Sequence, residues 1–203
     1  MPMRGCTGRC RRRLDGRGGA RSYRAMTDAP TLHTDRLILR PHKIADYPAC
    51  RALWADAQVV RHVGGMPLDA QAVWFRLLRY AGMWSLLGYG MWAIEDRTSG
   101  VFLGECGLLS AERGLAELEG VPEAGWVLGS QAWGKGIASE AMEAVLRWAD
   151  AHVDAPSLRC IIAPDHGASI RVAEKLGFVA LVDRMLGDTP MRVFDRPRRS
   201  PSA

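Results

Sequence analysis

Two glycines at the start of a helix form the part of this sequence best suited to binding a ligand. Gly134 and Gly136 lie in the segment QAWGKGIASEA, between Gln131 and Ser139. Glycine tolerates positive φ and lets the backbone approach a ligand without an intervening Cβ. The first N–H groups of a helix lack partners within the helix, and the helix dipole favours an anion there. The spacing therefore predicts a turn that binds a pyrophosphate, although two glycines also fit an ordinary tight turn.

The residues around this turn predict a strand before it and a helix after it. Residues 124–128 (AGWVL) have the character of a strand. After the turn, apolar residues recur with helical spacing while charged residues occupy the opposite face; the apolar positions are Ile137, Ala141, Val145 and Trp148. A doubly wound dinucleotide-binding fold would place the turn after its first strand, with a third glycine where Ser139 stands. The sequence excludes that fold on both counts.

Length and composition indicate one globular domain. The 203 residues are enough for one substantial core and too few for two comfortable ones. No run of about 18 apolar residues occurs, so no membrane-spanning helix is expected. The cysteines are odd in number and lack C-x-x-C spacing: Cys6, Cys10, Cys50, Cys106 and Cys160. This pattern favours reduced thiols in a cytoplasmic protein, without a metal site.

The net charge of +5 is concentrated at the N-terminus. Residues 1–25 contain eight arginines and one acid, Asp15, so they carry +7 and leave −2 for residues 26–203. The domain therefore offers no general attraction for nucleic acid. We expect residues 1–25 to be a disordered basic leader, from a start codon assigned upstream of Met26. An organelle-targeting or RNA-binding arm is the alternative.

The remaining patterns predict a mixed α/β arrangement around one sheet. A polar turn at 96–100 predicts a hairpin between two of the strands. Asp46 and Asp69 are expected to cap helices that end near Trp54 and Leu87, and Gly177 to end a later helix. Strands are expected at residues 36–40, 89–95, 101–109, 124–128, 158–163, 178–182 and 191–194, and a further helix at 168–176.

Four blocks in this order resemble the GNAT superfamily of N-acetyltransferases. Gln131, Gly134 and Gly136 match its signature Gln/Arg-x-x-Gly-x-Gly/Ala. The blocks TLHTDRLILRP, WGKGIASEA, SIRVAEKLGF and RVFDRP are similar to the RimJ/RimL branch, which modifies protein N-terminal amines and small amines; they span residues 31–197. The resemblance implies one domain over residues 26–203, with a central mixed, mostly antiparallel sheet flanked by helices.

The resemblance also implies acetyl-CoA as co-substrate, an amine as acceptor and no metal. The pyrophosphate would bind residues of the turn: Gln131, Trp133, Gly134, Lys135, Gly136, Ile137, Ala138 and Ser139. Val127 and Leu128 would lie along the pantetheine arm, with a backbone N–H directed at the thioester carbonyl. The protein would be a monomer or homodimer, without membrane or nucleic-acid partners.

The sequence departs from the family pattern at two positions. His166 stands where the family often has an asparagine that binds pantetheine, although Ser169 of the same motif is present. Glu174 stands where many members have a tyrosine that protonates the leaving thiolate. A thiol with an ordinary pKa near 8.5 can leave as thiolate, so transfer does not require that tyrosine.

The attacking amine must be neutral, so a base is needed. Glu123 is the first candidate, because the RimJ/RimL branch often has an acid there, and Glu105 is the second. His62 is the third, with a surface role as its alternative. Cys106 suggests a covalent acyl-enzyme, but a small core residue is the simpler interpretation, since direct transfer needs no nucleophile.

The sequence thus predicts a cytoplasmic N-acetyltransferase that works by direct transfer in a ternary complex. One alternative is an acyl-CoA-binding regulatory module that has lost turnover, which the residues at 166 and 174 make conceivable. An RNA-associated protein that uses the arginine leader is another.

Overall fold

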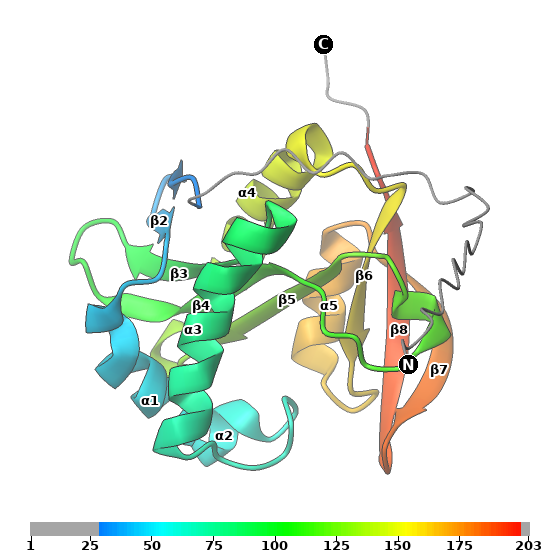
Figure 1. Cartoon of the computed structure of the whole chain (residues 1–203), viewed down its shortest axis with the longest axis horizontal. Coiled ribbons are helices and arrows are strands. Elements are labelled where there is room, and N and C mark those ends of the chain that lie inside the picture. Colours follow the sequence, from blue (N-terminus) through cyan, green and yellow to red (C-terminus); the bar gives the residue numbers. More distant parts are fainter. Residues whose placement is uncertain (1–28, 200–203) are drawn as a thin grey trace, which may run out of the picture.

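A computed structural model describes residues 29–199. The basic leader predicted for residues 1–25 lies outside the described residues. Within them, eight strands form one sheet in the order β1-β2-β3-β4-β5-β6-β8-β7 (Figure 1). Every neighbouring pair is antiparallel except β5 and β6, which are parallel. The mixed, mostly antiparallel sheet predicted for the chain is therefore confirmed.

The strands of the sheet follow the predicted segments closely, with one addition at the N-terminal end. The expected hairpin and the strand before the glycine turn are both present. The strands are β1 (Leu32–His33), β2 (Leu37–Arg40), β3 (Met91–Asp96), β4 (Phe102–Leu109), β5 (Glu123–Leu128), β6 (Ser157–Ile162), β7 (Val179–Leu186) and β8 (Thr189–Pro197).

Helices cover both faces of the sheet. On one face lie α1 (Tyr47–Ala55), α2 (Ala57–Val60) and α3 (Ala70–Leu87), which share a cluster of buried apolar side chains with Val127 of β5. On the other lies α4 (Ile137–His152), which packs in the main core against Ala124 and Leu128 of the same strand; α5 (Gly167–Lys175) packs there too (Figure 1). Alternate residues of β5 thus point to different helical layers, as strand geometry requires.

Local chemistry explains the turn between β3 and β4. The carboxylate of Asp96 accepts hydrogen bonds from the backbone N–H groups of Thr98 and Ser99, at 3.1 and 2.8 Å. Gly100 closes the turn with φ of 71° and open space around the position of a Cβ. The hairpin predicted from this polar turn is confirmed.

The two predicted helix caps have different outcomes. Asp69 does cap α3, because its carboxylate accepts from the Ala72 N–H at 2.7 Å. The cap predicted at Asp46 is wrong: this residue precedes α1 but makes no side-chain cap bond to it. Its carboxylate instead receives two hydrogen bonds from the guanidinium of Arg40, each 2.8 Å, and one from the Lys43 N–H. The carboxylate of Asp46 therefore pairs with Arg40 of β2 instead of capping α1.

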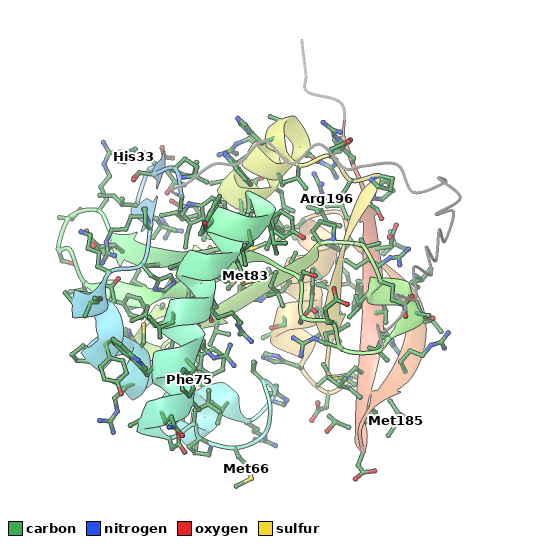
Figure 2. All side chains as sticks on the ribbon, viewed as in Figure 1. His33, Met66, Phe75, Met83, Met185 and Arg196 are labelled. Atoms are coloured by element: carbon green, nitrogen blue, oxygen red, sulfur yellow. The ribbon has the colours of Figure 1, made fainter. Side chains whose placement is uncertain are left out.

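Among the strands and α-helices, the sequence patterns did not predict β1 and α2, each of which has too few residues for a recognisable period. The strand β7 was predicted but runs on to Leu186, because its side chains are nearly all exposed and give no alternation of buried and exposed positions. Large apolar side chains at the surface include Phe75 on α3 and Met185 on β7 (Figure 2). Among the described residues, no helix is both long and apolar enough to cross a bilayer.

Candidate active site

A cavity of about 700 Å³ opens where β5 and β6 separate. The two strands pair at a single registered position, Glu123 with Arg159. Beyond it β5 runs on without β6, and Trp126, Val127 and Leu128 line the cavity. A strand that loses its neighbour has backbone groups free on that edge. The cavity therefore has one wall with hydrogen-bonding capacity for an extended ligand.

The glycine turn forms the end of this cavity. Gly134 and Gly136 have φ of 70° and 76°, and both line the cavity. A Cβ on Gly134 would meet nothing within 4 Å, so backbone conformation rather than crowding requires glycine here. Gly136 is the N-cap of α4 and no side chain caps that helix. The first N–H groups of α4 therefore have no side-chain cap, and such helix starts bind anions; phosphate binding at this turn stays a prediction.

An ion pair between Arg36 and Glu140 holds the glycine turn in place. The carboxylate of Glu140 accepts hydrogen bonds from the Arg36 N–H, from Arg36 Nε and from the Thr34 hydroxyl, at 3.0, 2.7 and 2.6 Å. The same guanidinium donates to the Lys135 carbonyl at 3.0 Å. These contacts lower the pKa of Glu140, although its partial burial opposes the shift. Glu140, the acid in the first turn of α4, is thus paired with Thr34 and Arg36 in the segment between β1 and β2.

Most of the residues assigned from the sequence to the co-substrate lie around this one cavity. They come from β5, the glycine turn, the first turn of α4 and the region of α5: Val127, Leu128, Trp133, Gly134, Gly136, Ile137, Ala138, Ser139, His166 and Ser169. Two assigned residues are not in the lining. The Gln131 amide folds back beside Gly129, and Lys135 contributes its carbonyl to Arg36.

Glu123, the first candidate base, is held in a bidentate ion pair. Arg113 Nε and Nη2 donate to its two carboxylate oxygens at 2.9 and 3.0 Å. The residue is 5% exposed and is not part of the cavity lining. Both oxygens of the Glu123 carboxylate therefore already accept hydrogen bonds from Arg113.

Glu105, the second candidate, is completely buried beneath α1 and α3. Its Oε1 accepts from Trp54 Nε1 at 2.7 Å and from the Tyr80 hydroxyl at 2.6 Å. His42 Nε2 lies 3.9 Å from Oε2. Burial raises the pKa of the Tyr80 hydroxyl, with the nearby Glu105 charge adding to the shift. This carboxylate also lies outside the cavity lining.

Three side chains of metal-binding type meet beside Glu105. Ligand atoms of His42, Cys50 and Glu105 all lie within 4.8 Å of one another. Burial raises the pKa of the Cys50 thiol to about 12, and burial also lowers the pKa of His42. The thiol is thus protonated and the imidazole neutral at pH 7. Cys106, considered above as a nucleophile, is fully buried, and burial raises its pKa as well.

Several cavity residues were not assigned from the sequence. They come from α2 and the segment after it, and from the exposed side of α5: Gln58, Arg61, Arg171 and Lys175. His62, the third candidate base, also lines the cavity. No motif marks the segment after α2, because its position depends on the tertiary packing of α2 against α1 and α3.

Two imidazoles meet across the cavity. The rings of His62 and His166 stack with centroids 4.3 Å apart and planes 12° from parallel. His166 Nε2 lies 3.5 Å from the Ser169 hydroxyl. Burial lowers the pKa of His166, and the proximity of His62 lowers it further. His166 is therefore a neutral polar group at pH 7, able to donate one hydrogen bond.

The fold and the chain have recognisable relatives. Residues 36–179 match the family described as the acetyltransferase (GNAT) domain. The protein YkkB of Bacillus subtilis is 34% identical over 111 residues, which span 54% of this chain and 63% of YkkB. A GnaT-family acetyltransferase from Bordetella pertussis superimposes with a TM-score of 0.74 at 30% identity, covering 83% of this chain and 99% of that one. RimL, a ribosomal L7/L12 α-N-protein acetyltransferase solved with coenzyme A, has a TM-score of 0.69 at 16% identity, covering 83% and 98%, which shows a shared fold alone.

Proposed function

Because this chain belongs to the GNAT acetyltransferase family, we propose that it is an N-acetyltransferase that moves an acetyl group from acetyl-CoA to a primary amine. The observation that carries the proposal is the cavity between β5 and the uncapped start of α4. One end of it suits a pyrophosphate and the other presents a strand edge to an extended arm. The presence of coenzyme A in the RimL structure supports the same co-substrate.

In this proposal the pyrophosphate binds the backbone N–H groups at Gly134–Ser139, and the pantetheine arm lies along Trp126–Leu128. A backbone N–H of β5 then faces the thioester carbonyl. Attack by an amine develops negative charge on that oxygen, and a preorganised donor stabilises the transition state more than the ground state. His166 and Ser169 also line the cavity, where they can hold the arm in place. Transfer is direct, within a ternary complex.

The cysteines favour this direct route. Covalent transfer would need a thiolate, and burial raises the pKa of Cys106 and Cys160. Both side chains are fully buried or nearly so and neither lines the cavity. We therefore propose no acyl-enzyme. We also propose a cytoplasmic location and a place in the RimJ/RimL branch, on the basis of the sequence blocks and the likeness to RimL.

The acceptor is expected to be an amine of modest basicity, such as a peptide α-amine or a comparable small amine. At pH 7 an α-amine is roughly 10–17% neutral, whereas a lysine side chain is neutral to only about 0.04%. We therefore expect kcat/KM for peptides that begin with Ala or Ser to exceed that for N-blocked lysine peptides by about 10²-fold. Acetyl-CoA consumption with both peptide sets and a panel of small amines measures this ratio.

The same assay separates the alternatives. Activity confined to the blocked lysine peptides would overturn the acceptor class. Tight binding of coenzyme A without transfer to any amine would favour a regulatory module that has lost turnover. The departures from the family pattern at His166 and Glu174 are the observations that make this second function worth testing.

A further inference from the structure

His62 is the only one of the three candidate bases that lines the cavity within the described residues. It lies two residues after Val60, the last residue of α2, and its side chain is 20% exposed. Its Nδ1 lies 3.3 Å from Asp165 Oδ1, on the loop between β6 and α5. This contact favours the proton on Nδ1, which leaves the lone pair of Nε2 to accept another. A carboxylate that orients an imidazole in this way also stabilises the imidazolium that forms.

The imidazole stacked on His62 is that of His166. Burial lowers the pKa of His166, and the neighbouring His62 lowers it further, so His166 stays neutral. Asp165 faces His62 and can compensate a positive charge there. The other charged groups around the cavity are Arg61 beside His62, and Arg171 and Lys175 on α5. All three are exposed cations. Asp165 is therefore the anion that contacts the stacked imidazoles, through His62.

The two candidate carboxylates, Glu123 and Glu105, already have hydrogen-bond partners outside the cavity. Glu123 is bound by both nitrogens of the Arg113 fork, and Glu105 is fully buried with hydrogen bonds from Trp54 and Tyr80. A base must come within hydrogen-bond reach of the proton it removes. Neither carboxylate lines the cavity that would hold the thioester and the amine.

We propose that His62 is the general base of the acetyl transfer and that Asp165 is its positioning residue; the inference rests on the proposed function. Nε2 of His62 takes one proton from the acceptor ammonium. The freed nitrogen lone pair forms the C–N bond at the thioester carbonyl, and the C–S bond then breaks. The second amine proton passes to the departing thiolate, so free coenzyme A leaves as the thiol. His62 returns its proton to solvent through its exposed edge.

Replacement of the base gives the first test. His62→Gln keeps a polar side chain of similar reach, and we expect kcat to fall by about 10²-fold with the affinity for coenzyme A, measured by calorimetry, unchanged. Added imidazole should restore turnover to the smaller His62→Ala variant. His33→Gln is the matched control, because His33 is an exposed histidine on β1, away from α2 and α5 (Figure 2). Its kcat should equal that of the wild type.

The pH dependence of kcat gives a test that a merely structural role would not pass. In the wild type, kcat should fall on the acid side as the base becomes protonated. Asp165→Asn removes the carboxylate that favours imidazolium, so the midpoint of this fall should move to lower pH, with kcat reduced by about 10-fold. Thermal unfolding of each variant confirms that it is folded.

Three outcomes overturn the inference. An unchanged kcat in folded His62→Gln would overturn the base assignment while the proposed function stands, since the wild type is active in the same assay. A fall of about 10² in Glu123→Gln or Glu105→Gln, with His62→Gln unaffected, would move the role to that carboxylate. A wild-type protein that binds coenzyme A but acetylates no amine would overturn both the function and this inference.

Discussion

A Gly136→Val protein is expected to lose affinity for coenzyme A by about 10²–10⁴-fold while it stays folded. The branched side chain would stand at the N-cap of α4, where the helix has no side-chain cap and its first residues line the cavity. A hydrogen bond to a charged group contributes about 1.5–3 kcal/mol, so losing two of them accounts for that range. Calorimetric titration with coenzyme A measures the change.

Backbone strain must be separated from lost binding in this experiment. Gly136 has φ of 76°, and a valine in the left-handed region costs about 1–2 kcal/mol. Gly100 has φ of 71° and nothing within 4 Å of an added Cβ, whereas at Gly136 the nearest atom is Arg36 Nη2 at 3.6 Å, an ordinary contact; Gly100 lies in the β3–β4 turn outside the cavity lining. Gly100→Val should therefore show a similar fall in melting temperature and normal affinity. Equal affinities in the two variants would refute the phosphate-binding turn.

Asp150→Ala should destabilise the protein by about 3–5 kcal/mol, because it leaves a buried cation without its partner. Arg196 on β8 is 3% exposed (Figure 2). Its Nη1 and Nη2 donate to the two carboxylate oxygens of Asp150 on α4, at 3.0 and 2.7 Å. Urea unfolding monitored by circular dichroism gives the change in free energy. Asp154→Ala is the control, since Asp154 is almost fully exposed and 3.6 Å from Arg198; an exposed pair contributes about 0–1 kcal/mol.

The same pair predicts a pH dependence of stability. Burial, the largest single influence, raises the pKa of Asp150, but the hydrogen bonds from Arg196 and the Arg199 N–H, together with the charges of both arginines, outweigh it and lower the pKa. A carboxyl group whose pKa is lower in the folded state contributes stability above its unfolded pKa, near 3.9, and loses it as pH falls through the folded pKa. Wild type should therefore lose more stability than Asp150→Ala below about pH 4. Parallel losses in the two proteins would contradict this linkage.

Elements that depend on neighbours in sequence could be predicted from the chain. The α4 helix follows from its apolar spacing, and the Asp69 cap from a carboxylate three residues before the N–H it accepts. The β3–β4 hairpin follows from the polar turn that closes it. The Asp46 cap could not be predicted, because whether its carboxylate meets a helix N–H or Arg40 depends on where β2 lies.

The sequence by itself determined the glycine turn, because the positive φ of Gly134 and Gly136 and the exposed helix start are local properties of consecutive residues. Together with the ordered blocks, it also determined the family and the sheet. Only the tertiary structure decided which titratable groups reach the cavity. Glu123 contacts Arg113 and Glu105 lies beneath two helices, whereas His62, just after α2, contacts Asp165 and His166. Contacts between residues so far apart in the sequence arise from long-range packing, which residue type and spacing do not specify.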